Sequence, residues 1–122
     1  MRVAVLADDL IWSTRLADAL RAAGAEPRSV RSLGLLRDAL PEVDRVVVDL
    51  TARAYDGVEA IQAARAAGLQ VLAVGQHDDH ELRKRALGAG AVRVYAYRKL
   101  FEDGPATLGA WLGATTASGA GR

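Results

Sequence analysis

Three aspartates stand directly after two apolar runs of the sequence and are its sharpest chemical feature. Asp8 and Asp9 follow the run Arg2–Leu6, and Asp49 closes the valine run 46–48. Carboxylates that lie close together repel one another, so the pKa of one of them rises unless a cation neutralises them. Oxygen ligands of this kind suit Mg²⁺, and an aspartate beside Mg²⁺ can act as a nucleophile toward phosphorus. The alternative is that Asp8 or Asp9 only caps the helix that follows it.

Short apolar runs alternate with segments of helical spacing along the chain. Runs that are apolar on both faces are typical of parallel strands buried between helices. We expect strands at residues 2–6, 26–32, 46–49, 70–74 and 92–97, and helices at residues 10–23, 33–40, 57–67, 79–89 and 102–113. Five strand–helix repeats predict an α/β fold, a flavodoxin-like doubly wound (βα)5 domain over residues 1–113. Residues 114–122 are small and Gly/Ser-rich, which predicts a disordered tail.

The commonest five-stranded sheet of this kind has the strand order 2-1-3-4-5, with its working site at the carboxyl ends of the strands. In that order strands one and three are neighbours. Asp8 and Asp49 are therefore expected to lie within a few ångströms of each other, in one acidic pocket.

Composition narrows the class of protein. The chain has 122 residues, of which 51% are hydrophobic and 25% charged, so it can bury a core as one compact domain. Sixteen basic and fifteen acidic residues leave a net charge of +1, which gives no reason to expect nucleic acid or a membrane surface as a partner. The absence of cysteine excludes disulfides, thiol nucleophiles and cysteine-ligated metal. Neither a signal peptide nor a membrane-spanning run is evident, so we expect a cytoplasmic domain.

The order and spacing of these motifs resemble the receiver domain of bacterial two-component response regulators, over about residues 2–113. That family has an acidic pair after its first strand, a phosphoacceptor aspartate after its third, and an Asp-Gly pair where its third helix begins. Residues 45–50 match the third strand, and Asp56-Gly57 stands at the family's distance from Asp49. The resemblance implies that Asp49 is the candidate phosphoacceptor. It also implies a weak Mg²⁺ site made by Asp8, Asp9, Asp49 and the backbone carbonyl of Thr51.

Several positions depart from the family pattern. Ala7 stands where the family has one acid of its pair, and Gly75 replaces the Thr or Ser that bonds the phosphoryl group. Counting along the fifth strand puts Tyr97 at the position of the family's lysine. Lys99 follows two residues later, and a continued strand places it on the same side about 6–7 Å further along. Tyr95 lies where receivers often carry an aromatic switch residue, although packing is the alternative for it.

The departures predict an atypical receiver in which Gly75, Tyr95, Tyr97 and Lys99 are degenerate switch positions. Losing the hydroxyl and the lysine weakens the coupling between phosphorylation and movement of the fourth helix and fifth strand. We therefore expect a single-domain signalling protein, not an enzyme, that acts through protein–protein interaction. Its expected partner is a histidine kinase or another signalling protein, and a homodimer through the fourth helix, fifth strand and last helix is a further expectation.

Two other functions fit the same fold, because a fold does not determine a function. One is a small Mg²⁺-dependent phosphatase, or another phosphoryl-handling enzyme, with Asp49 as its nucleophile. No acid–base residue or substrate-binding insertion is evident for it. The other is a flavodoxin-like cofactor binder, which lacks a Ser/Thr/Gly-rich phosphate loop after the first strand.

Overall fold

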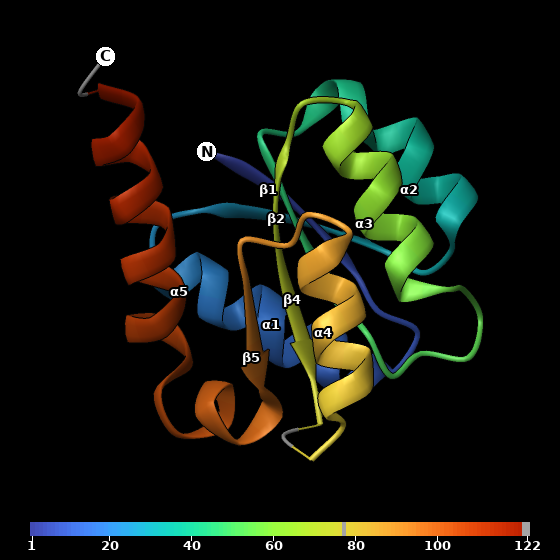
Figure 1. Ribbon diagram of the computed structural model, residues 1–122. Coiled ribbons are helices and arrows are strands. Elements are labelled where there is room, and N and C mark those ends of the chain that lie inside the picture. The colour runs from blue at the N-terminus through green and yellow to red at the C-terminus, as the bar shows by residue number, and fades with distance from the viewer. Residues whose placement is uncertain (77, 121–122) are drawn as a thin grey trace.

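Five parallel strands form one sheet with helices on both faces (Figure 1). The computed structural model describes residues 1–76 and 78–120, with side chains described as far as residue 113. The strands are β1 (Arg2–Leu6), β2 (Glu26–Val30), β3 (Arg45–Asp49), β4 (Gln70–Gly75) and β5 (Arg93–Ala96). Their order is β2-β1-β3-β4-β5 and every neighbouring pair is parallel, which confirms the predicted fold class and strand order.

The helices divide between the two faces of the sheet. They are α1 (Leu10–Ala22), α2 (Leu33–Ala39), the 3₁₀ turn η1 (Leu40–Glu42), α3 (Gly57–Ala66), α4 (His80–Gly88) and α5 (Tyr97–Ala120). Helices α1 and α5 pack together on one face, and α2, α3 and α4 cover the other (Figure 1). No helix in the described part of the chain is long and apolar enough to cross a membrane.

Alternation along the central strands builds a separate core on each face. In β1, Val3 and Val5 pack with Leu16 and Leu20 of α1. The residue between them, Ala4, joins the core under α2, α3 and α4. This follows from the period of two in a strand, which sends successive side chains to opposite faces. Both faces are apolar, so β1 and β3 read as continuous apolar runs in the sequence.

A polar residue marks the beginning of each of the first four long helices. Its side-chain oxygen accepts hydrogen bonds from backbone N–H groups of the first turn, which lack partners inside the helix. The four caps are Asp9, Ser32, Asp56 and Asp79. The caps therefore fix where each of these helices begins after the strand that precedes it.

The end of β5 differs from the prediction. The expected strand over residues 92–97 is one residue too long at each end, and helix α5 begins at Tyr97. The physical reason is that β5 is the edge strand of the described sheet and pairs with β4, whose last residue, Gly75, is the partner of Ala96. Inside α5 the backbone at Asp103 is not helical (φ −150°, ψ 39°), so a short helical segment precedes the longer one. Pro105 then stands early in the longer helix, where proline is tolerated.

The disorder predicted for residues 114–122 is not tested by this structure. The backbone of α5 continues to Ala120, while the side chains of residues 114–120 and all of residues 121–122 lie outside the described part. The domain boundary at residue 113 therefore stays a prediction.

Candidate functional site

Asp49 ends β3 and is almost completely buried, with 1% of its surface exposed. Its Oδ1 atom accepts hydrogen bonds from the Thr51 backbone N–H at 3.0 Å and from the Thr51 hydroxyl at 2.9 Å. The Tyr97 hydroxyl donates another hydrogen bond to the same oxygen, and the two hydroxyls also contact each other. The candidate phosphoacceptor is therefore covered by a phenol and by its own loop.

Tyr97 lies at the carboxyl edge of the sheet, directly after the last paired residue of β5. Its half-buried ring packs on Trp12 of α1, with 4.2 Å between ring centroids and 35° between ring planes. Burial, the hydrogen bond to Asp49 and the negative charges of Asp49 and Asp9 raise the pKa of Tyr97 above its ordinary value, against an opposing effect of the Thr51 hydroxyl. At neutral pH the phenol therefore keeps its proton and is uncharged, and it donates a hydrogen bond to the carboxylate.

Tyr55 is a site residue that the sequence analysis missed. Its hydroxyl lies 2.7 Å from the backbone carbonyl oxygen of Asp49 and 2.9 Å from that of Leu6, so it joins the ends of β3 and β1. Burial is the main cause that raises the pKa of Tyr55, and the charges of Asp49 and Asp8 add to it. The available signal was an aromatic residue in the loop directly after the Asp49 strand, in a segment that otherwise looks like exposed loop.

The acidic pair after β1 is used for local structure. Asp9 is the N-cap of α1, where its Oδ1 accepts the N–H groups of Ile11 at 2.8 Å and Trp12 at 3.1 Å. Asp8 Oδ2 accepts the N–H groups of Arg53 at 3.0 Å and Ala54 at 3.1 Å, in the loop between β3 and α3. The capping alternative weighed for this pair is therefore correct for Asp9, and Asp8 fastens the loop beside the site.

The donor set does not fit a built Mg²⁺ site. Among the described residues, no group of three or more His, Cys, Asp or Glu side chains could hold a metal ion. Ala7 contributes no carboxylate, and an oxygen of each of Asp8 and Asp9 is already engaged by two backbone N–H groups. The Mg²⁺ site expected from Asp8, Asp9, Asp49 and the Thr51 carbonyl therefore stays a prediction. The backbone hydrogen bonds of Asp8 and Asp9 compete with it for carboxylate oxygens.

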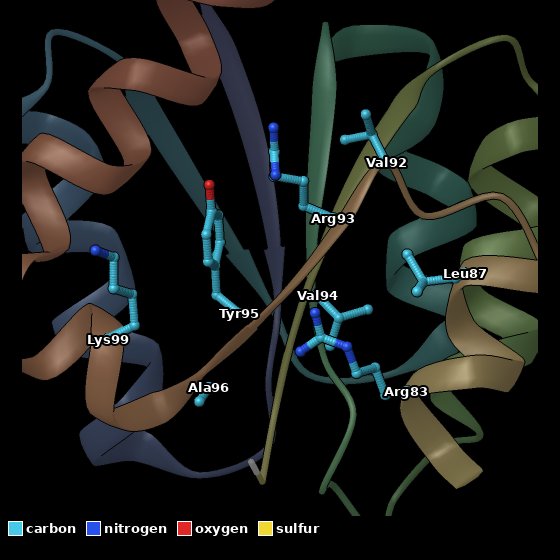
Figure 2. Close-up of a pocket in the computed structure, with 8 residues that line it drawn as sticks. All are labelled: Arg83, Leu87, Val92, Arg93, Val94, Tyr95, Ala96 and Lys99. Carbon is cyan, nitrogen blue, oxygen red and sulfur yellow. The ribbon is translucent and has the colours of Figure 1, made fainter. Parts of the chain in front are cut away.

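The remaining degenerate positions lie on and beside β4 and β5. Gly75 is buried, and a Cβ atom built on it would lie 3.4 Å from Leu50 Cδ1, so the backbone leaves room for a small side chain but supplies no hydroxyl. The suggestion that Lys99 follows Tyr97 along a continued strand is wrong, because the chain turns into a helix after Ala96. Lys99 instead lines a hollow beside α4 and β5, together with the half-buried Tyr95 (Figure 2).

Solved structures with the same architecture include response regulator receiver domains. The chain superposes on NtrX from Brucella abortus with a TM-score of 0.72 at 19% identity, and the match covers 79% of this chain and 23% of that one. FixJ-N gives a TM-score of 0.70 at 22% identity, covering 79% and 80% of the two chains. A CheY-like response regulator receiver domain protein from Methanospirillum hungatei gives 0.69 at 19% identity, covering 83% and 87%.

The chain has a receiver-domain fold. No family model matches its sequence, and no curated protein matches it either. The receiver-domain similarity spans about a quarter of NtrX, so the activity of that whole protein does not transfer to this chain. Within the receiver fold, Asp49, Thr51 and Tyr97 meet at the carboxyl edge of the sheet. Asp8, Asp9 and Tyr55 fix the loops around them.

Proposed function

We propose that this chain is a receiver-fold signalling domain that works through protein–protein interaction, with its Asp49 site held closed instead of being switched by phosphorylation. The hydrogen bond from the Tyr97 hydroxyl to the Asp49 carboxylate carries the proposal. The phenol lies against Oδ1 of that carboxylate, so it narrows the space in which a phosphoryl group on Asp49 would stand. The Tyr97 ring is in turn held by Trp12, so opening the site separates two packed aromatic rings.

The charges at the site also support a closed state. Phosphoryl transfer depends on positioned cations that stabilise the charge on the transferred group. Among the described residues no lysine or arginine side chain is hydrogen-bonded or ion-paired to Asp49, and Gly75 brings no donor side chain. The lack of such a cation or donor at Asp49, among the described residues, also argues against a phosphatase that uses Asp49 as its nucleophile. We therefore propose a binding role instead of an enzymatic one, with the cytoplasm as the proposed location.

The interaction surface in this proposal is the face formed by α4, β5 and the first part of α5. Two large apolar side chains are exposed there, Leu87 at 43% and Val92 at 49%. Exposed apolar side chains of this size on one face are typical of surfaces that contact another protein. The proposed partner is a histidine kinase or another signalling protein. A second copy of this chain, related by a two-fold axis, is the alternative partner.

An NMR experiment tests whether phosphorylation controls this face. Amide spectra of ¹⁵N-labelled protein are recorded before and after addition of a small-molecule phosphodonor with Mg²⁺, for the wild type and for Asp49→Asn. We expect the amide signals of α4 and β5 to stay in place in both proteins. Signals of α4 and β5 that move in the wild type and not in Asp49→Asn would overturn the proposal, because they would show a working phosphorylation switch.

A further inference from the structure

A hollow of about 390 Å³ runs along α4 and the edge strand β5 (Figure 2). Three cationic side chains line it, Arg83 from α4, Arg93 from β5 and Lys99 from the start of α5. Its apolar lining includes Leu87 and Val92, which are 43% and 49% exposed. The hollow therefore combines positive charge at several points with an uncovered apolar surface.

The three cations have no counter-ion within the described residues. None of their side chains is in an ion pair or a hydrogen bond there, although five ion pairs occur elsewhere on the surface. Glu102, the acidic residue closest in sequence to Lys99 on α5, is paired with Arg98 at 3.0 Å. None of the described residues that line the hollow is acidic. Its positive charge is therefore available to a binding partner.

We infer that this hollow binds an acidic peptide segment of a partner protein, one that carries an apolar side chain between its carboxylates. Carboxylates complement Arg83, Arg93 and Lys99, and the apolar side chain covers Leu87 and Val92. Charge complementarity of this kind selects the partner and speeds its association. The inference rests on the proposed function, since it names the chemistry of the partner at the proposed interaction face.

The other occupants fit this hollow less well. A second copy of the chain related by a two-fold axis would bring the same cations close to one another, and cationic side chains on an edge strand oppose such pairing. A nucleic acid strand would satisfy the cations, but it presents flat bases and polar sugars instead of a flexible aliphatic side chain that can pack on Leu87 and Val92. The net charge of the whole chain is only +1, so its overall field attracts nucleic acid weakly.

The test uses a short peptide of Asp and Glu with a central leucine, titrated into the ¹⁵N-labelled full chain. The matched probes are the same peptide with Asn and Gln in place of its acids, and a single-stranded DNA of equal charge. The variants are Arg83→Gln, Arg93→Gln and Lys99→Gln. The matched control is Lys84→Gln, which removes the same charge from the next residue of α4, outside the hollow.

We expect the acidic peptide to shift the amide signals of residues 83–99 selectively. Each hollow variant should weaken binding by about two- to fivefold, and Lys84→Gln by less than twofold. The inference is overturned if the neutral peptide or the DNA binds as tightly, if Lys84→Gln weakens binding as much as the hollow variants, or if the shifts fall elsewhere. If the peptide does not bind and the amide signals of α4 and β5 still do not move after phosphodonor treatment, the inferred partner chemistry is wrong and the proposed function stands. If the peptide binds only after phosphodonor treatment, phosphorylation controls this face. Both the proposed function and the inference that rests on it are then overturned.

Discussion

Replacing Tyr97 by phenylalanine removes one hydroxyl group from the Asp49 site and keeps the ring that packs on Trp12. Hydrogen bonds to a charged partner contribute about 1.5–3 kcal/mol. Two features reduce that figure here: Thr51 still donates two hydrogen bonds to the same Asp49 oxygen, and Tyr97 is only half-buried. We therefore expect Tyr97→Phe to lower the free energy of unfolding by about 1 kcal/mol, or Tm by about 3–6 °C for a domain of this size.

Urea denaturation at neutral pH, followed by circular dichroism, measures this loss. The matched control is Tyr95→Phe, because Tyr95 is also half-buried and its hydroxyl makes no hydrogen bond among the described residues. The control should stay within about 0.5 kcal/mol of the wild type. The argument for a closed site would be refuted by a Tyr97→Phe protein as stable as the wild type, or by equal losses in the two variants.

Two further predictions concern alkaline pH and the space around glycines. Burial raises the pKa of Tyr97 and Tyr55 above the ordinary value of 10.0, so the folded state keeps protons that the unfolded chain loses. The free energy of unfolding should therefore fall as the pH rises above about 10. Urea midpoints measured at rising pH should fall less steeply for Tyr97→Phe than for the wild type. Equal slopes of midpoint against pH in the two proteins would contradict this prediction. Gly57→Ala should lower the free energy of unfolding by about 1–3 kcal/mol, because the new Cβ would lie 3.0 Å from Leu50 Cδ2 and 3.2 Å from its Cα. Gly34→Ala is the control, since nothing lies within 4 Å of a Cβ built at that position and alanine is the better helix former. Thermal denaturation should show this variant to be as stable as the wild type or more stable. A similar loss of stability in both variants would contradict the crowding argument.

The layered α/β fold could be predicted because each central strand is specified locally. The valine run before Asp49 is apolar on both faces, and both faces of β3 are in fact covered by helices. A glycine follows the end of each of α1 and α3 in the sequence. Gly24 and Gly68 do have positive φ values, 92° and 82°, which are costly for other residues.

The details of the site could not be predicted because they depend on contacts between distant parts of the chain. The Tyr97 hydroxyl hydrogen-bonds to Asp49, which lies 48 residues earlier in the sequence. Residues 92–97 have the same alternating pattern whether or not a neighbouring strand extends far enough to pair with their last residue. Asp9 illustrates a second limit. An aspartate between a strand and a helix suits both a metal site and a helix cap, and only the position of the helix decides between them.

Intact-mass spectrometry after exposure to a small-molecule phosphodonor with Mg²⁺ tests the closed site most directly. It compares the wild type with Asp49→Asn and with the double variant Gly75→Ser, Tyr97→Lys, which introduces a hydroxyl at the end of β4 and a cation in place of the phenol at Asp49. We predict no phosphoryl adduct on the wild type and a partial adduct on the double variant. A stoichiometric adduct on the wild type that disappears in Asp49→Asn would contradict the closed site.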